Sequence, residues 1–538
     1  MEHRLGLSGV ALACALTITG CEDRGSRGRS PDDAGRDASP ALTMDSAVTD
    51  AADPLDATTL DASGERDAGA DSAAPVSDGG GFDSGPGPDS GSPGCPPVAR
   101  RTIVDVPQGI LPDTMAHWRC ENLYVLNGIV LVHSEDPAAP QVLRIDSGVV
   151  VHGLTGAAGS ARGFLVVTRN GRLEAEGTRD APIVFTSSRP EGMRARDDWG
   201  GITLLGRDAA GATRRAEGFP TTAVGVGELD PFLAYGPVSP DAADPAWSCG
   251  TLRYLRVEFA SYNAGGAMGN ESNALQLYSC GYGTQLDYVQ SHLSGDDGIE
   301  LFGGQADVSH LVVTGASDDS VDWDDGYHGR MQFIAAQQHP DAADFGIEAG
   351  GSGDAPALAP DVRLFNATFV GSNGMAGQIA ARLRGASRGH LRNLVFLGFT
   401  DGYLDIGGAT AAMNLVSVPP LLSIRNSVLW QGAAPIGWPT GSDDTADGSP
   451  PLIEADFFVT AEQLNHVTDP MLGAPFDRLA PDWSPRAGAP LGAEHAESPS
   501  ETPGDTRPPF FDTSADYVGA LSPEGPDWTA GWTAYPAR

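Results

Sequence analysis

Two acidic segments with nearly the same sequence contain the residues whose chemistry stands out most in this chain. They read GDDGIELFGG (295–304) and GASDDSVDWDDG (315–326). Carboxylates held close together can bind a hard cation such as Ca²⁺, or act in pairs as general acid and base. Either chemistry requires a fold that stacks the two segments. The aligned pairs, each at an offset of 22 residues, are Asp296 with Asp318, Asp297 with Asp319 and Glu300 with Asp322.

The repeat around these segments predicts such a fold. LDYVQSHLSGDDGIELFGG (286–304) aligns with VSHLVVTGASDDSVDWDDG (308–326), and 390–408 repeats the plan with Leu404 and Asp405 at the positions of Ile299 and Glu300. Short β-rich runs bounded by Gly, Asn, Asp or Pro recur along the chain, which contains 70 Gly and 41 Pro. A period near 22 residues is typical of a parallel β-helix, whereas propeller blades need about twice that. We predict an all-β chain that forms a right-handed parallel β-helix.

Alternation along the strands predicts where the acidic side chains point. If Ile299 and Val321 face the core, Glu300 and Asp322 point outward on the same face and form a surface pair. Stacked strands lie roughly 5 Å apart, where two unit charges repel by about 3 kcal/mol at an effective dielectric constant near 20. Water, a retained proton, a neighbouring arginine or a bound cation would relieve this repulsion.

Two interpretations of the acids follow from the residues alone. Aspartates such as Asp296 and Asp318 can have a purely architectural role, because they accept backbone hydrogen bonds at turns. Alternatively the acids bind Ca²⁺, which takes six to eight oxygen ligands in flexible geometry. The candidate ligands are Asp297, Glu300, Asp319, Asp322, Asp324 and Asp325.

A third interpretation is hydrolytic. The string GDDGI and the later Tyr327-His328-Gly329-Arg330 resemble segments of β-helix polygalacturonases. That resemblance implies carboxylates about 6.5–9.5 Å apart that protonate the glycosidic oxygen and activate water. It makes Glu300, Asp322 and His328 candidate catalytic residues. The chain departs from the pattern, because Tyr327 replaces a glycine and no lysine is present for the Arg-x-Lys motif.

The charge of the chain argues against a nucleic-acid partner. The formal net charge is −38, and all 33 basic residues are arginines. Neutralising a phosphate backbone requires a basic face, and none is evident in the sequence. We therefore expect other partners.

The N-terminal residues predict export and a lipid anchor. MEHRLGLSGVALACALTITGC has a short start, an apolar stretch and small residues before Cys21, which is typical of a signal peptide. The ending Ile18-Thr19-Gly20-Cys21 resembles a bacterial lipobox, which implies that residues 1–20 are cleaved and Cys21 carries lipid. We expect the outer membrane or the cell surface. Residues 21–94 are rich in Asp, Ala, Ser, Gly and Pro and are predicted to form a disordered acidic tether.

The remaining cysteines predict disulfides. With Cys14 removed and Cys21 lipidated, an even number of cysteines remains in an exported protein. Four cysteines allow three pairings. We favour the two local pairs, which are Cys95–Cys120 and Cys249–Cys280.

Several phrases resemble a family of bacterial exported β-helix proteins with the pectin-lyase-like fold and a largely unassigned role. The resemblance implies a fold and export, but no reaction. We expect the β-helix over 95–435 and a Pro-rich irregular segment with a C-terminal cap over 436–538, in which Trp528 and Trp532 cover the last exposed coil edge. The phrases are GRLEAEGTRDAPIVFTSS (171–188), DDWGGITLLG (197–206), LRYLRVEFA (252–260), DDGIELFGG (296–304), DDSVDWDDG (318–326) and DYVGALSPEGPDWTAGWT (516–533).

These observations predict a surface-anchored lipoprotein that binds extracellular polysaccharide or another envelope component along the flank of its β-helix. Ca²⁺ at the stacked carboxylates is its candidate cofactor. The alternative from another class is a polysaccharide-degrading hydrolase or lyase that uses the acidic residues. A purely structural surface protein is the second alternative, and it predicts tolerance of changes throughout the acidic segments.

Overall fold

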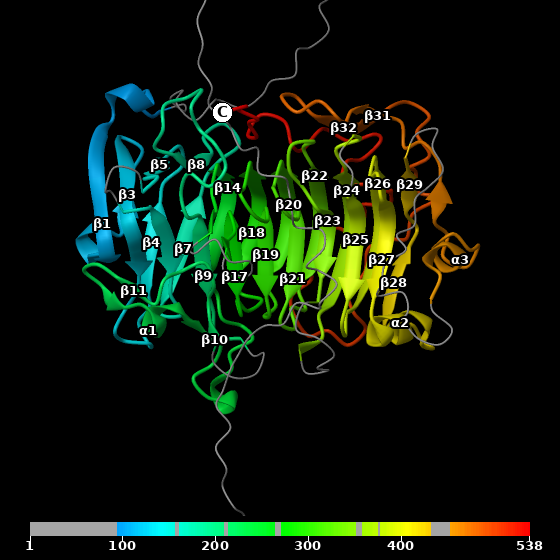
Figure 1. Ribbon diagram of the computed structural model, residues 1–538, viewed down its shortest axis with the longest axis horizontal. Coiled ribbons are helices and arrows are strands. Elements are labelled where there is room, and N and C mark those ends of the chain that lie inside the picture. The colour runs from blue at the N-terminus through cyan, green and yellow to red at the C-terminus, as the bar shows by residue number, and fades with distance from the viewer. Residues whose placement is uncertain are drawn as a thin grey trace, which may run out of the picture.

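Strands of successive coils lie side by side along the body of the chain and form a right-handed parallel β-helix, as predicted (Figure 1). The structure is a computed structural model. It describes residues 94–538 apart from 157–160, 209–213, 264–270, 351–357, 375–376 and 432–451. The predicted signal peptide, Cys21 and the tether up to residue 93 lie outside the described residues.

Three faces of parallel strands run along the β-helix. The first face carries the candidate residues. Each of its strands pairs with the corresponding strand of the next coil. Its strands are β6 (Phe164–Val167), β9 (Ile202–Leu205), β17 (Leu275–Tyr278), β19 (Ile299–Phe302), β21 (Val321–Asp324), β23 (Phe345–Ala349), β25 (Ile379–Arg384) and β27 (Gly402–Gly407).

Long bent strands form most of the second and third faces. The residue at each bend has a positive φ, for example 59° at Tyr288 and 49° at His310. The bent strands are β14 (Gly250–Glu258), β18 (Gln285–His292), β20 (Asp307–Thr314), β22 (Arg330–Gln337), β24 (Asp361–Val370) and β26 (Arg388–Leu397). In the outer coils separate strands take these places, namely β2 (His117–Trp118), β4 (Gln141–Ile145), β7 (Gly171–Glu176) and β28 (Leu422–Arg425) on the second face and β5 (Val150–Gly153), β8 (Ile183–Ser187), β29 (Val428–Trp430) and β30 (His466–Val467) on the third. The first coils also contain β1 (Thr102–Ile110) and β3 (Asn122–Val132).

The register confirms the repeat that the sequence predicts. Leu286 pairs with Val308, Ile299 with Val321 and Glu300 with Asp322. The row that begins at Ile299 and Val321 continues through later coils and reaches Leu404, as the alignment of 390–408 predicts. Later coils are longer than 22 residues, because loops extend their turns.

Apolar side chains of successive coils stack inside the β-helix. Leu286, Val308, Met331 and Leu364 form one such row, and each is at most 1% exposed. Full burial of one aliphatic side chain of this size contributes about 1.5–3 kcal/mol. Because the strands alternate, every inward apolar residue fixes an outward neighbour, and the stack therefore holds the outward acids in register.

The segment between β9 and β14, described over residues 207–208 and 214–249, packs against the outer surface of the first face and is named here the β9–β14 insertion. Its Phe219, Leu233 and Tyr235 form one buried cluster with the outward-facing Tyr278 and Phe302. The insertion therefore controls access to the first face around β17 and β19. It contains β10 (Arg214–Arg215), β11 (Thr222–Ala223), β12 (Gly227–Glu228), α1 (Asp230–Leu233) and β13 (Ala234–Tyr235), and the pair β15 (Tyr262–Asn263) and β16 (Glu271–Ser272) follows β14.

Short elements close the last coils. α2 (Ala409–Val416) contacts β27 and β28, and α3 (Glu454–Phe458) places Phe458 in the main core. β31 (Leu472–Ala474) and β32 (Asp482–Pro485) follow them in the chain and form an antiparallel pair, which packs on the outer side of the third face. The last coil is thus covered by α3 and not by the end of the chain.

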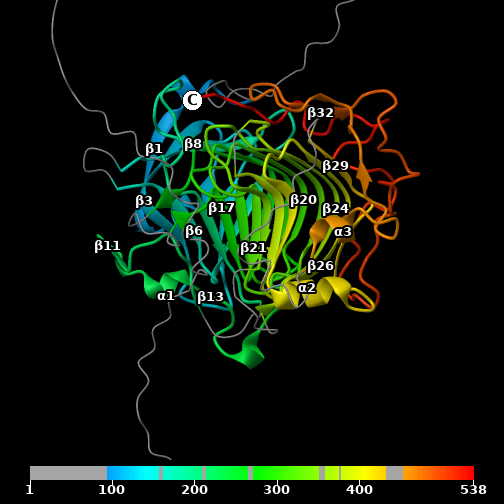
Figure 2. The same ribbon diagram turned by 45° about the vertical axis from the view of Figure 1, so that its right-hand side comes forward.

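Residues 491–538, the C-terminal segment, run back along the flank of the β-helix (Figures 1 and 2). Asn393 Nδ2 donates a hydrogen bond to the carbonyl of Glu497 at 2.7 Å, and Arg256 Nη1 donates to the carbonyl of Trp532 at 3.1 Å. Trp528 and Trp532 therefore lie against the middle coils and not over the last coil edge, where the sequence analysis expected them. The physical reason is an apolar strip on the outer side of the third face, which the segment covers with Val518, Leu521 and Trp532.

Two disulfides cross-link the body, Cys95–Cys120 and Cys249–Cys280, which is the local pairing favoured from the sequence. Each joins segments of neighbouring coils. Among the described residues, no helix has the length and apolar character needed to span a membrane.

Candidate functional site

A row of polar side chains projects outward from the first face. The strand register places Glu300 beside Asp322 and Asp322 beside Glu348. The row ends with Arg382 and Asp405, which pair in the next coils. The inward neighbours Ile299, Val321 and Ile347 are buried in the core, so the outward direction of the acids follows from strand alternation.

Turn residues before β19 and β21 bring further carboxylates to this row. We define the acidic cluster as the seven acids of three interlocking groups, in each of which one carboxylate oxygen per residue lies within 4.8 Å of the others. Asp322 belongs to two of the groups. The groups are Asp296, Asp297 and Asp318; Asp297, Glu300 and Asp322; and Asp319, Asp322 and Glu348.

Two of the turn acids also have an architectural role. Asp297 Oδ1 accepts a hydrogen bond from the backbone amide of Asp319 at 2.9 Å, and Asp319 Oδ1 accepts one from the amide of Phe345 at 2.7 Å. Each aspartate therefore tethers the turn of the next coil. The sequence analysis assigned this role mainly to Asp296 and Asp318.

The acidic cluster is more deeply covered than a surface pair. Glu300 points outward as predicted, but it is only 8% exposed. Asp297 and Asp319 are buried, and Asp322 is half-buried. The cover comes in part from the β9–β14 insertion, whose Glu217 lies close enough to repel Glu300.

Burial and mutual repulsion both disfavour the ionised form of these acids. Burial raises the pKa of Glu300 well above its usual range, and the charges of Glu217 and Asp322 raise it further. Burial likewise raises the pKa of Asp322, with a further increase from Glu348. The pKa values of Asp296, Asp297 and Asp319 are raised in the same direction, with burial again the largest cause.

Two arginines of the first face pair with acids of the outward row. Arg384 pairs with Glu348 at 2.7 Å, and Arg382 pairs with Asp405 at 3.4 Å. Oδ1 of Asp322 is buried and accepts no hydrogen bond from the residues that the structure describes. A carboxylate oxygen in this condition is costly unless a proton or a cation satisfies it.

Two of the candidate ligands lie at the border of the cluster. Asp325 is buried, forms an ion pair with Arg214 and accepts a hydrogen bond from the Tyr235 hydroxyl at 2.9 Å. Its charge is therefore already compensated by the β9–β14 insertion. Asp324 lies near Asp322, and its charge contributes to the raised pKa of Asp322.

The structure does not bring His328 into the acidic cluster. Its Nδ1 contacts the carbonyl of Gly326 at 2.7 Å, and its own carbonyl accepts a hydrogen bond from Arg507 of the C-terminal segment. Glu300 and Asp322, in contrast, are adjacent. The three candidate catalytic residues thus do not converge on one point.

Sequence reasoning did not assign Asp296, Asp318 or Glu348 as cation ligands. Glu348 carries a recognisable signal, because Ile347-Glu348 repeats the pattern of Ile299-Glu300. The signal was hidden by spacing: Asp322 and Glu348 are 26 residues apart, so a strict 22-residue alignment passes over it.

By its fold the protein is a parallel β-helix protein, and it carries an acidic cluster on one outer face. The family model of the pectate-lyase-like beta helix domain matches residues 111–425, which is more than half of the chain. The chain belongs to this family, which indicates a polysaccharide-related function in general. A search of curated proteins and a search of solved structures each found no match.

Proposed function

We propose that this protein is a surface-anchored β-helix lipoprotein that binds extracellular polysaccharide, or another envelope component, with Ca²⁺ held in the acidic cluster. The observation that carries the proposal is the set of three interlocking carboxylate groups, with oxygens within 4.8 Å of one another. Such closeness is unfavourable without compensation. Two unit charges at that separation repel by about 3.5 kcal/mol at an effective dielectric constant near 20.

The donor set fits a hard cation. All its ligand atoms are carboxylate oxygens, which Ca²⁺ and Mg²⁺ prefer, and no imidazole or thiolate belongs to the groups. Glu300 and Asp322 would supply ligands from the strands, and Asp297 and Asp319 from the turns. Glu348 adds a further acid, whereas Asp325 is already compensated by Arg214.

A cation in the cluster would change what the first face can bind. Without it, the concentrated negative charge repels acidic polysaccharides. When bound, Ca²⁺ supplies positive charge that can neutralise the cluster and accept oxygen ligands from a glycan. Such a ligand would approach from the side of the half-buried acids of the cluster, which are Asp296, Asp318, Asp322 and Glu348.

The lipid anchor and the location of the protein are part of the same proposal. They rest on the lipobox-like ending at Cys21 and on the acidic composition of residues 21–94. An extended tether would hold the β-helix away from the membrane, at the outer membrane or the cell surface. Labelling with palmitate tests the anchor, because Cys21→Ser should abolish incorporation while the disulfide-linked body remains intact.

A polysaccharide hydrolase or lyase is the second candidate function. The raised pKa of Glu300 supports it, because a general acid must hold a proton near neutral pH. The close approach of Glu300 and Asp322 opposes the inverting mechanism, which needs carboxyl groups about 6.5–9.5 Å apart. Release of reducing or unsaturated sugar ends from a polysaccharide panel, lost in Glu300→Gln, would establish this activity.

Polysaccharide retention with and without Ca²⁺ tests the binding function. The purified protein is applied to a panel of immobilised acidic and neutral polysaccharides in excess Ca²⁺ and then in EDTA. We expect retention that requires Ca²⁺ and is lost in Asp322→Asn. Asp405→Asn is the matched control, because Asp405 lies in the same outward row but pairs with Arg382. Absence of retention on every polymer, or retention that EDTA leaves unchanged, would contradict the proposal.

A further inference from the structure

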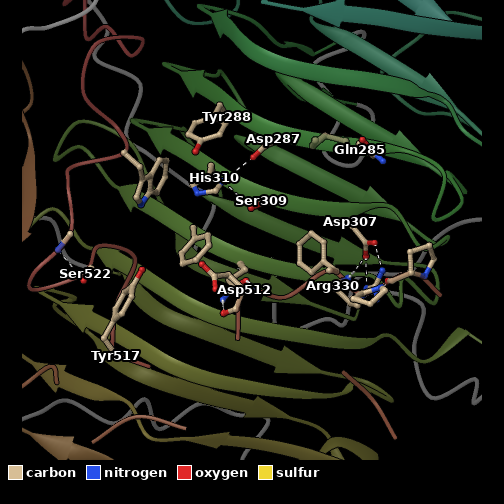
Figure 3. A pocket seen from close by; sticks show the side chains of 18 of the residues that line it. Gln285, Asp287, Tyr288, Asp307, Ser309, His310, Arg330, Asp512, Tyr517 and Ser522 are labelled. Carbon is tan, nitrogen blue, oxygen red and sulfur yellow. Dashed lines mark hydrogen bonds and ion pairs between the residues drawn. The ribbon is translucent and has the colours of Figure 1, made fainter. Parts of the chain in front are cut away.

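A cleft lies on a different side of the β-helix from the acidic cluster, between β18, β20 and β22 and the C-terminal segment (Figure 3). Its volume is about 710 Å³, within the range of about 300–1,000 Å³ typical of small-molecule sites. Strand residues such as Gln285 and Ser309 form one wall. Tyr517, Trp528 and neighbouring prolines of the C-terminal segment form the opposite wall.

The strand wall presents hydrogen-bonding groups in a fixed arrangement. His310 Nδ1 lies 2.8 Å from Asp287 Oδ1 and 3.0 Å from Ser309 Oγ. Both partners use the same ring nitrogen, whereas a Ser-His-Asp triad needs the serine and the carboxylate on opposite nitrogens. The arrangement therefore suits binding and not nucleophilic catalysis. Gln285 is exposed in the cleft and makes no side-chain hydrogen bond to the described residues.

The charged groups of this wall already have charged partners, some of which lie outside the cleft. Arg330 Nε donates to Asp307 Oδ1 at 3.0 Å, and its Nη1 donates to Glu501 of the C-terminal segment at 2.8 Å. Asp287 pairs with Arg253 at 3.3 Å as well as with His310. Arg330 is thus engaged and offers no vacant guanidinium edge to a carboxylate or phosphate. Asp512 of the C-terminal segment adds an exposed carboxylate to the lining, so the charges of the cleft select against an anionic ligand.

The opposite wall provides apolar surface. Phe510 lies beside Arg330, with the guanidinium carbon 5.3 Å from the ring centre, and Tyr517 and Trp528 are half-buried along the cleft. Tyr288 and His310 stack face to face at 4.1 Å, so these faces are not available as a cage for an organic cation. Aromatic and proline surface opposite amide, hydroxyl and carboxylate groups matches a pyranose, which has apolar C–H faces and hydroxyl edges.

We propose that this cleft binds an uncharged oligosaccharide. Gln285 and Asp287 would bond its hydroxyls, and Phe510 would pack against a sugar face. The site extends the proposed function, because it lies on a different side of the β-helix and requires no cation. A failure of Ca²⁺ binding at the acidic cluster would leave this proposal standing.

Variants that keep the fold intact make the proposal testable. Gln285→Ala removes an exposed side chain with no described partner, and Phe510→Ala removes a half-buried ring from the C-terminal segment. Gln108→Ala is the matched control, because Gln108 is half-exposed on β1, in the first coils and outside the cleft. Asp322→Asn controls for binding at the acidic cluster. A cooperative thermal unfolding transition verifies that each variant is folded.

The experiment is calorimetric titration of the purified protein with tetrasaccharides of β-1,4-glucose, β-1,4-mannose, β-1,4-xylose and α-1,4-glucose, each in EDTA, with tetragalacturonate as the anionic comparison. We expect at least one neutral tetrasaccharide to bind and Gln285→Ala to weaken it about 2- to 12-fold, as the loss of one neutral hydrogen bond predicts. Phe510→Ala should weaken it as well, while Gln108→Ala and Asp322→Asn should not.

Three results would overturn the proposal. The first is no binding of any neutral tetrasaccharide. The second is binding that persists unchanged in the Gln285→Ala/Phe510→Ala double variant. The third is equal or tighter binding of tetragalacturonate in the same cleft, which would show that the charges of the cleft do not select an uncharged ligand.

Discussion

Asp322→Asn should stabilise the metal-free protein, although it changes a residue of the candidate site. Asp322 belongs to two of the three carboxylate groups, one with Asp297 and Glu300 and one with Asp319 and Glu348. At a separation of 4.8 Å, each ionised pair costs about 0.9 kcal/mol in bulk water and about 3.5 kcal/mol at an effective dielectric constant near 20. Protonation of one acid of a pair avoids part of this repulsion. Each unit by which the pKa of that acid is raised corresponds to about 1.4 kcal/mol.

The expected gain in the free energy of unfolding at pH 7 without metal is therefore about 1–3 kcal/mol. For a domain of this size it corresponds to an increase in Tm of about 1–6 °C. In Ca²⁺ at 100 times its dissociation constant, the wild-type protein should gain about 2.7 kcal/mol, and Asp322→Asn should gain much less. Thermal unfolding in EDTA and in excess Ca²⁺ measures both effects.

Asp325→Asn is the matched control for this prediction. Asp325 is 2% exposed, forms an ion pair with Arg214 and accepts a hydrogen bond from Tyr235. The same chemical change should here destabilise the protein by about 1–3 kcal/mol, because it weakens a compensated buried charge. If Asp322→Asn lowers the metal-free Tm as Asp325→Asn does, or keeps the full Ca²⁺ shift, the electrostatic reasoning is refuted.

Three further predictions follow from the structure. The stability gained in Asp322→Asn should shrink as the pH falls from about 8 to about 4, as measured by denaturant unfolding. The reason is the raised pKa of Asp322, which lets the folded wild type take up a proton that the unfolded state lacks. A gain that is independent of pH would contradict this origin. Asn393→Ala removes two hydrogen bonds to the backbone of Glu497, and it does so at a residue with a φ of 59°. The change should cost about 2–4 kcal/mol in the free energy of unfolding and speed proteolysis of the C-terminal segment. Unchanged cleavage would show that this contact does not hold the segment. The double variant Cys249→Ser/Cys280→Ser opens a cross-link with a sequence separation of 31 and should lose about 3–4 kcal/mol in chemical unfolding. Full reduction of the wild type should cost more than this, because it also opens Cys95–Cys120; an equal stability of the double variant and the oxidised wild type would contradict the prediction.

Local pattern was sufficient to predict the stacking of the coils. The 22-residue offset between 286–304 and 308–326 places Glu300 beside Asp322, and the structure has this register. The same alignment places Asp405 in the row that contains Glu300. These features follow from strand alternation and turn residues, which depend on near neighbours in the chain.

Other features of the site depend on contacts between distant segments. Arg214 compensates Asp325 from 111 residues away, and the β9–β14 insertion covers part of the first face. No periodicity in residues 207–249 predicts where this segment packs. Its position is determined by the apolar outward residues Tyr278 and Phe302, which it buries.

The sequence by itself determined the solenoid and the row of outward acids, because each follows from a repeat or from short-range spacing. It favoured the local disulfide pairing among three possible ones, and the structure has that pairing. Only the tertiary structure decided how deeply the acids are buried, which of them are compensated and where the C-terminal segment lies. The physical reason is that segments distant in the sequence fold over the apolar surfaces of the β-helix. These segments determine which acids are buried and which of them receive a partner of opposite charge.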